Sequence, residues 1–309
     1  MDGMSALLDG PRAREAFLLR STLTAPWSMK IADEAALTLC SVVSGRGCVM
    51  PAEGGVRWLG PGDVSLFKGP RPYVVADDPA TPPQAIVLPG QVCVTPDGLP
   101  VLISTLGTRS WGNDPNGETV IVTGSYQLPG ETSRRLLDAL PELIVLTGEE
   151  WGSPLPALLN EEIVKDEPGQ SAMLDRLLDL TLISALRAWF ARADGAAPGW
   201  YLAYGDPVVG PALRLMQDEV ARPWTVDSLA AEVGVSRAGL ARRFRELVGE
   251  PPMTFLTSWR LDLAADLLRS PDMTLSAVAR QVGYSTPFAL SAAFKRVRGM
   301  SPSEYRVSA

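Results

Sequence analysis

Short runs rich in apolar and β-forming residues occupy the first part of the chain, from about residue 15 to residue 125. This pattern is typical of β-strands. Turns rich in Gly, Pro and Asp separate the runs, and many short strands at close spacing favour a sandwich or barrel. The predicted strands are residues 17–23, 37–43, 47–51, 56–59, 64–68, 73–76, 86–88, 101–105 and 119–124.

After about residue 130, apolar residues recur with the spacing of an α-helix. It predicts helices over residues 134–140, 155–164 and 170–192. The apolar face of the last helix is wide for a lone surface helix, so it packs on the strands and the preceding helix or forms a homodimer interface. We favour the dimer. Residues 194–207, rich in Gly, Ala and Pro, predict an interdomain linker.

The last hundred residues contain the same helical pattern twice. Each copy has a short apolar helix, a Gly in a turn, a Ser that can cap the next helix, and a second helix with basic residues. The capping residues Ser236 and Ser285 are 49 positions apart, and the turn glycines are Gly234 and Gly283. Two helix-turn-helix units in tandem indicate DNA binding. A long helix, predicted over residues 252–269, joins them, with one apolar stripe that includes Trp259.

The repeated units resemble the arabinose-regulator (AraC/XylS) family of bacterial transcription factors. The matching residues include Val235-Ser236-Arg237, Leu240 to Phe244, Gly283-Tyr284-Ser285 and the ending Gly299-Met300-Ser301-Pro302 with Tyr305-Arg306. The resemblance covers roughly residues 208 to 306. It implies that both recognition helices enter adjacent major-groove segments of double-stranded DNA. RNA polymerase is a further candidate partner.

The candidate DNA-binding residues lie at the start and on the outward face of each recognition helix. They are Ser236, Arg237, Ala238, Ala241, Arg242, Arg243, Ser285, Thr286, Phe288, Ser291, Ala292, Lys295 and Arg296. A bidentate Arg contact to guanine is the commonest specific base contact, which makes Arg242 the first candidate for base recognition. Phe288 and Ala292 are candidates for contact with thymine methyl groups, and docking on phosphates is the alternative for the second helix.

The Pro-Gly-Asp turn at Gly60–Asp63, followed by Pro72-Tyr73, resembles the cupin sensor domains found fused to such DNA-binding domains. The expected fold class is therefore α+β. An N-terminal all-β cupin-like jelly-roll barrel with a helical dimerisation segment precedes an all-α tandem helix-turn-helix domain. The expected boundaries are 1–150 for the sensor, 151–193 for the helical segment, 194–207 for the linker and 208–309 for the DNA-binding domain.

Charge is divided unevenly along the chain, whose formal net charge is −7. Residues 207–309 hold 13 Lys and Arg against 10 Asp and Glu, whereas residues 1–206 hold 15 against 25. Nucleic-acid affinity depends on neutralising phosphates. The basic excess therefore places DNA binding in the C-terminal part and keeps the acidic part away from DNA.

The chain contains no histidine. Metal-dependent cupins resemble one another in holding a metal with several His and a Glu, so we expect no metal, no cofactor, no catalytic residue and no enzyme activity. Three cysteines fit a reducing compartment. No signal peptide is recognisable in Met1–Met4, and no apolar run reaches the roughly 18 residues of a membrane span. We expect a cytoplasmic protein.

Two kinds of signal remain open for the barrel. The first is a small-molecule effector, and the candidate lining residues are Trp27, Leu39, Trp58, Phe67, Tyr73 and Trp111. The alternative is redox sensing through Cys40, Cys48 or Cys93. A two-residue hairpin loop at Gly45-Arg46 would put Cys40 and Cys48 on opposite faces of a sheet, which disfavours a disulfide between them. We favour the effector.

Overall fold

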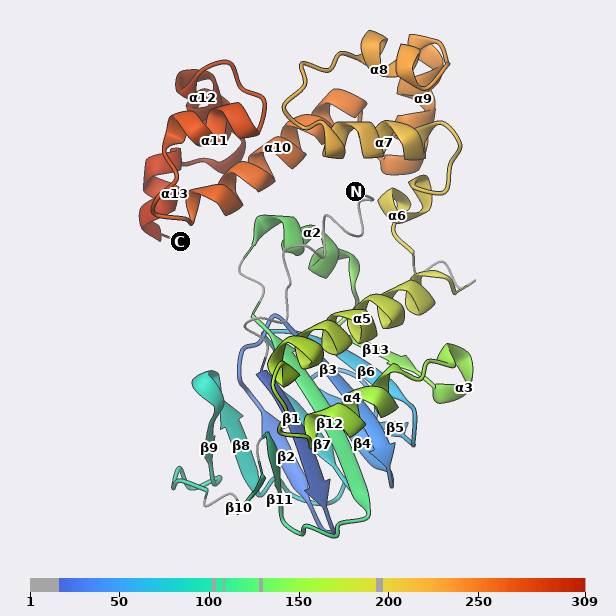
Figure 1. Ribbon diagram of the computed structural model, residues 1–309, viewed down its shortest axis with the longest axis vertical. Coiled ribbons are helices and arrows are strands. Elements are labelled where there is room, and N and C mark those ends of the chain that lie inside the picture. The colour runs from blue at the N-terminus through green and yellow to red at the C-terminus, as the bar shows by residue number, and fades with distance from the viewer. Residues whose placement is uncertain (1–16, 102–103, 108, 128–129, 193–196, 309) are drawn as a thin grey trace. The chain divides into compact units, whose positions relative to one another are not determined.

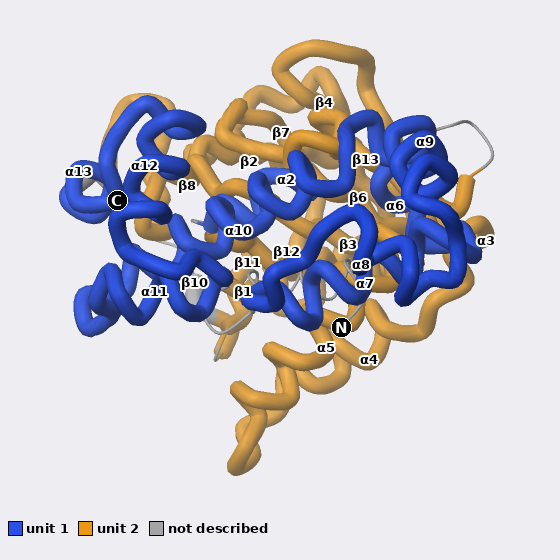
Figure 2. Tube along the Cα trace, turned by 90° about the horizontal axis from the view of Figure 1, so that it is seen from above, with its two compact units in different colours: residues 1–10, 129–136, 194–309 blue, residues 11–128, 137–193 orange. Residues whose placement is uncertain are grey.

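The computed structural model describes residues 17–101, 104–107, 109–127, 130–192 and 197–308. These residues form two compact units, shown in different colours in Figure 2. One contains residues 17–127 and 137–192. The other contains residues 197–308 together with residues 130–136, a segment from the middle of the sequence. Of the expectations above, those for residues 1–16, residues 102 and 103 of the run 101–105, and the linker residues 194–196 lie outside the described part.

Two β-sheets make up the first unit (Figure 1). The strand order of the seven-stranded sheet is β10 (Ser104–Gly107), β11 (Ser110–Gly112), β1 (Phe17–Leu23), β12 (Thr119–Tyr126), β3 (Leu37–Ser44), β6 (Val64–Lys68) and β13 (Leu143–Leu146). The order of the six-stranded sheet is β5 (Arg57–Leu59), β4 (Gly47–Pro51), β7 (Tyr73–Ala76), β2 (Ser28–Ile31), β8 (Ala85–Leu88) and β9 (Val92–Val94).

Side chains from both sheets share one apolar core. Cys40, Val42 and Ile121 from the seven-stranded sheet pack with Val49 and Val75 from the six-stranded sheet. Because successive residues of a strand point to opposite faces, only alternate residues of each strand reach this core. The arrangement is a sandwich of mainly antiparallel strands, as the sequence predicts.

Helices α3 (Gly148–Trp151), α4 (Leu155–Ile163) and α5 (Gln170–Phe190) belong to the same unit. Helix α4 contacts β3 and β12, and α5 contacts α4 and β13. A Cβ atom at Gly124 of β12 would lie 2.5 Å from Leu178 of α5, so glycine permits the close approach. The inner face of α5 therefore packs on the barrel and on α4, the arrangement that we expected less than a dimer interface.

Each predicted strand corresponds to an observed one, although Val56 precedes β5 and Val101 lies outside β10. The pairing expected for one turn is wrong. Strands β3 and β4, on either side of Gly45-Arg46, lie in different sheets, and β4 pairs with β5 and β7. The predicted hairpin at Gly45-Arg46 therefore does not form. A two-residue loop predicts a hairpin locally, but here the chain passes from one sheet of the sandwich to the other.

The second unit is helical (Figure 1). It contains two apolar cores. Its elements after residue 197 are α6 (Gly199–Ala203), α7 (Val209–Asp218), α8 (Val226–Glu232), α9 (Arg237–Val248), α10 (Pro252–Leu268), α11 (Leu275–Gln281), α12 (Pro287–Arg298) and α13 (Pro302–Ser308). Helix α6 lies within the stretch that the sequence predicts as a linker.

Helix α10 contributes to both cores. Phe255 and Trp259 from its first half pack with α8 and α9, whereas Leu261 and Leu268 from its second half pack with α11 and α12. The single apolar stripe expected for this helix is therefore wrong. Its apolar residues are distributed around the helix because it is covered by one core and then by the other.

Candidate DNA-binding and ligand-binding sites

The first helix-turn-helix consists of α8, a tight turn and α9. Thr225 and Ser228 cap the start of α8 reciprocally, a capping box. Gly234 in the turn has φ 70°, the left-handed region that glycine adopts at no steric cost. The hydroxyl of Ser236 then accepts a hydrogen bond from the Gly239 N–H at 3.1 Å and begins α9. The turn glycine and capping serine predicted from the sequence are confirmed here.

The second helix-turn-helix repeats this plan with one difference. Thr274 caps α11, and Gly283 in the turn has φ 80°. The residue that caps α12 is Thr286, whose hydroxyl accepts from the Ala289 N–H at 3.1 Å. The expected cap, Ser285, is wrong by one position. Pro287 occupies the first turn of the helix, where its fixed φ suits helix initiation, so the residue before it becomes the cap.

The faces of α9 are set by two buried residues, Leu240 and Phe244. At 3.6 residues per turn, the opposite face carries Ala238, Arg242 and Arg245, all exposed. Arg245 is absent from the residues expected at the DNA interface. Its spacing of seven from Ala238 on the outward face is the signal that could have identified it.

Arg243 lies at the flank of α9 and is engaged within the protein. Its guanidinium makes a bidentate contact with Asp206, with Nη2 2.6 Å and Nε 2.9 Å from Oδ2. Oδ1 of the same carboxylate accepts from the N–H groups of Val208 and Val209 at the start of α7. The hydrogen bond from Arg243 lowers the pKa of Asp206 to about 2. Arg243 therefore connects α9 to α7.

Arg237 and Arg242 also have acidic partners, but these pairs are exposed. Arg237 lies 3.4 Å from Asp227, and Arg242 lies 3.1 Å from Glu246 one turn along its own helix. Exposed pairs of this kind contribute only about 0.2–1 kcal/mol. Both arginines can therefore leave their partners for a phosphate or a base.

The second recognition helix presents a less polar face. Leu290 and Phe294 are buried, and Phe288 on the opposite side is 85% exposed. Ala292, Lys295 and Arg296 are also exposed. Together the two helices bring all the expected DNA-binding residues to the surface, with Ala241 and Ser291 partly covered.

A cavity of about 280 Å³ lies between the two sheets of the first unit. Its wall is mostly apolar, with a few hydroxyl, thiol, amide and carboxyl groups. The lining residues are Phe17, Leu19, Ser21, Met29, Ile31, Asp33, Cys40, Tyr73, Val75, Val87, Gln91, Cys93, Trp111, Ile121, Thr123 and Ser125. Cavities that are largely apolar and carry a few polar groups are typical small-molecule sites.

Two of the six expected effector-binding residues, Tyr73 and Trp111, line this cavity. Phe67 stacks on Tyr73, with ring centroids 3.6 Å apart, and Trp27 is buried in the core between the sheets. Leu39 is buried on the face of β3 opposite Cys40, since neighbouring residues of a strand alternate. Trp58 is 48% exposed, with the Arg46 guanidinium over its ring.

The three cysteines are free thiols, two of them buried. Burial raises the pKa of Cys40 to about 11, although hydrogen bonds with Ser65 and Thr123 oppose this. Burial also raises the pKa values of Cys48 and Cys93, and Asp78 and Asp77 add to the effect at Cys48. A sensor thiol needs a lowered pKa. These environments therefore do not support the redox alternative.

Within the described residues, no three His, Cys, Asp or Glu side chains are grouped so that they could hold a metal ion. None of the described helices is both long and apolar enough to cross a membrane.

Comparison with known proteins gives two family matches. Residues 2–191 match the cupin family, and residues 229–308 match a helix-turn-helix domain family. An AraC-like transcription regulator of Streptomyces lividans is 33% identical over 80% of this chain and 79% of its own length. One from Streptomyces antibioticus is 35% identical over 61% of this chain and 64% of its own length. The transcriptional regulator AlkR of Acinetobacter baylyi is 28% identical over 99% of both chains.

Proposed function

Because this chain belongs to the AraC-like transcriptional regulators that carry an N-terminal cupin domain, we propose that a small organic effector in the cavity between its sheets controls DNA binding. The observation that carries the proposal is the cavity itself, with Tyr73 and Trp111 in its wall. The protein acts as a cytoplasmic, non-enzymatic regulator, and RNA polymerase is a further candidate partner once it is bound to DNA.

The composition of the wall defines the class of effector. Apolar side chains from both sheets favour a compact, mainly apolar molecule. Ser125, Thr123 and Gln91 offer hydrogen bonds to one or two polar groups, and Asp33 contributes an acidic side chain. An anionic effector would have to approach this acid in an apolar surrounding, which is costly. We therefore expect a neutral or cationic molecule.

A cavity-filling substitution tests this proposal. Val87 of β8 lines the cavity, whereas Val92 of β9 is 52% exposed and does not. Neutral and cationic small molecules are screened on the full chain for a rise in Tm and for a change in affinity for duplexes selected from a random library. Val87→Trp should abolish both responses, and Val92→Trp should retain them. A full response in folded Val87→Trp would refute the cavity as the site.

A homodimer through α5 is the second part of the proposal. Beyond the residues that pack on the barrel, α5 exposes Met173 and Leu180, which are 53% and 51% accessible. They are seven residues apart and therefore lie on one outward face. A second copy of this helix would cover them, as expected from the width of the apolar face in the sequence.

Sedimentation of the full chain tests the dimer. Leu180→Glu should shift the protein toward monomer, because a charge would be buried at the interface. The control is Arg57→Glu, which places a glutamate at an exposed position of β5 remote in sequence. A wild-type monomer, or a Leu180→Glu dimer, would contradict the proposal.

A further inference from the structure

Residues 130–136 carry an unusual structural role. In sequence they follow β12 and precede β13, two strands of the seven-stranded sheet. In space they belong to the helical unit that binds DNA, as the colours of Figure 2 show. They form the first turns of helix α2 (Glu131–Ala139). We call residues 130–136 the docking segment.

A carboxylate of the DNA-binding domain caps the docking segment. Asp266 of α10 accepts hydrogen bonds from the N–H groups of Glu131 at 2.6 Å and Thr132 at 3.2 Å, and from the Thr132 hydroxyl. The first N–H groups of a helix lack partners within the helix and are normally capped by a nearby residue of the same chain segment. A Cβ atom at Gly130 would lie 3.3 Å from both Asp266 oxygens, so glycine leaves room for this cap.

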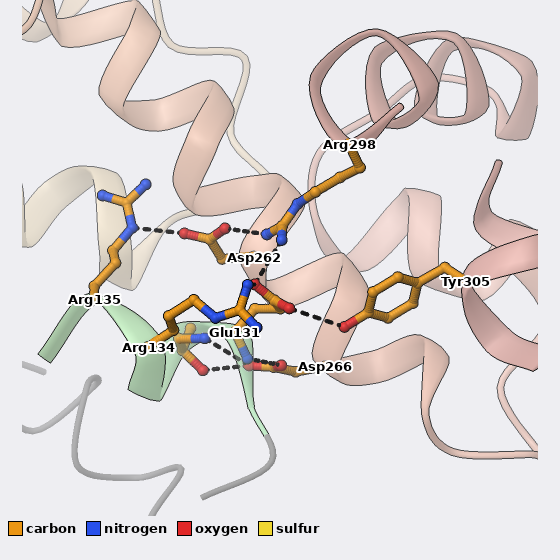
Figure 3. Close-up of polar contacts among 8 residues, drawn as sticks. Glu131, Arg134, Arg135, Asp262, Asp266, Arg298 and Tyr305 are labelled. Atoms are coloured by element: carbon orange, nitrogen blue, oxygen red, sulfur yellow. Dashed lines mark hydrogen bonds and ion pairs between the residues drawn. The ribbon is translucent and has the colours of Figure 1, made fainter. Parts of the chain in front are cut away.

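Ion pairs extend the contact to the end of the second recognition helix (Figure 3). The Glu131 carboxylate accepts from Arg298 of α12 at 2.5 Å and from the Tyr305 hydroxyl of α13 at 3.2 Å. Arg135 donates to Asp262 of α10 at 2.6 Å, and Arg298 also donates to Asp262.

These groups are shielded from water. Glu131 and Asp262 are only 9% and 8% exposed. Burial alone would raise the pKa of Glu131, but Arg298, Arg134 and the Tyr305 hydroxyl together lower that pKa. Leaving one member of a buried pair without its partner is strongly destabilising. The segment is therefore held by specific, mutually dependent contacts.

The chain connects this segment directly to the cavity. Ile121, Thr123 and Ser125 of β12 line the cavity, and a short connection leads from the end of β12 to Glu131. The contacts of the docking segment reach α10, which is shared by the two cores, and Arg298 at the end of α12. They leave the outward face of α12 exposed.

We propose that the docking segment is the regulatory connection between the sensor strands and the second helix-turn-helix. When it is docked, its hydrogen bonds and ion pairs with α10, α12 and α13 favour DNA binding. When it is released, these contacts are lost and DNA binding is weaker. This inference rests on the proposed effector response, because occupancy of the cavity would act on docking through β12. If bound DNA favours the docked state by a given free energy, docking favours DNA binding by the same free energy.

DNA affinity of full-length variants tests the inference, with a duplex selected by the wild-type chain as the probe. Glu131→Gln removes the charge that Arg298 and Tyr305 contact. The matched control, Asp138→Asn, makes the same acid-to-amide change at an exposed position of α2. Glu131→Gln should raise the Kd about fivefold or more, a typical coupling, while Asp138→Asn should stay within about twofold. Equal affinities for Glu131→Gln and wild type would overturn the inference.

Amide hydrogen exchange tests docking of the segment without relying on a single variant. The amides of Glu131 and Thr132 should be protected in the wild-type chain and exchange faster in Asp266→Ala, while peptides of the sheets stay unchanged. Thr132→Val and Asp266→Ala should affect Kd less than additively when combined, because both remove the same hydrogen bond. Unprotected wild-type amides or strictly additive effects would overturn docking.

The two proposals fail differently. If no molecule changes wild-type DNA affinity but Glu131→Gln weakens it, the effector proposal fails and the docking role stands. If a molecule acts equally on wild type and Glu131→Gln, the effector proposal stands and the docking segment is not the connection.

Discussion

Replacement of Arg242 by Ala should weaken specific DNA binding without affecting the fold. Arg242 points away from the core of α9, and its side chain is 72% exposed. To contact a base it gives up only its exposed pair with Glu246, worth about 0.3–0.5 kcal/mol. A bidentate contact with guanine contributes about 1–3 kcal/mol. The balance of roughly 0.5–2.7 kcal/mol corresponds to a Kd about twofold to hundredfold higher.

Fluorescence anisotropy with a selected duplex and with a scrambled one of equal length measures this effect. Arg242→Ala should lose affinity mainly for the selected duplex, because a base contact carries sequence information and a phosphate contact does not. Arg242→Lys should leave affinity for the scrambled duplex near that of wild type but restore little discrimination, since Lys lacks the planar fork of Arg. The free energy of unfolding should change by less than about 0.5 kcal/mol, as at other exposed positions.

Two results would refute this reasoning. Equal weakening on both duplexes would mean that Arg242 contacts phosphate, and unchanged affinity on both would remove it from the interface. Loss of thermal stability in Arg242→Ala would show that its pair with Glu246 matters to the fold, contrary to its exposure.

Other expected outcomes concern stability and redox chemistry. Asp206→Ala should lower the free energy of unfolding by about 1 kcal/mol, as for loss of a helix cap. Because Arg243 lowers the pKa of Asp206 to about 2, the stabilisation by Asp206 should be present above about pH 4 and lost as pH falls toward about 2. Urea unfolding of wild type and Arg243→Ala across this pH range checks the direction of the change. Joint replacement of Cys40, Cys48 and Cys93 by Ala should preserve the effector response, and peroxide should leave wild-type DNA affinity unchanged; a peroxide effect that the thiol-free protein lacks would restore the redox alternative.

Local patterns predicted most of the secondary structure but not all of it. Runs such as Phe17–Leu23 and Thr119–Tyr126 were found because they are short, rich in apolar and β-forming residues and bounded by turns. Alternation is weak in both, since residues on both faces of these strands are buried. Strands β2, β9, β11 and β13 were not predicted. Each has only three or four residues. β5, β7 and β8 are as short and were predicted, so short strands are recognised only in part from local sequence. The sheet to which each strand belongs depends on contacts distant in sequence, which is why the turn at Gly45-Arg46 was misassigned.

The candidate sites were predictable to the extent that their residues are local. Capping residues, turn glycines and the outward faces of α9 and α12 follow from helical spacing. The partner of Arg243 lies 37 positions away at Asp206, so the sequence did not reveal that this arginine is held within the protein. Glu131 contacts residues more than 160 positions away, Arg298 and Tyr305, and no local pattern indicates them. Tyr73 and Trp111 were predicted from residue type, whereas β-strand alternation turned Leu39 away from the cavity.

The internal contacts of the arginines also set the expected salt dependence of DNA binding. Arg243 and Arg298 are engaged by carboxylates, and Arg260 and Arg306 donate to backbone carbonyls. The exposed cations that remain on the two recognition helices are Arg237, Arg242, Arg245, Lys295 and Arg296.

If these five cations per chain neutralise phosphates, log K should fall with log salt at a slope of about −4 to −5, from roughly −0.9 per contact. Contact by all 13 Lys and Arg of residues 207–309 would instead give a slope near −12. Anisotropy titrations from about 50 to 200 mM KCl distinguish these values. The slope is compared per bound chain, because a dimer on two sites doubles it. A slope per chain much steeper than about −5 would mean that Lys or Arg residues beyond these five also contact phosphates.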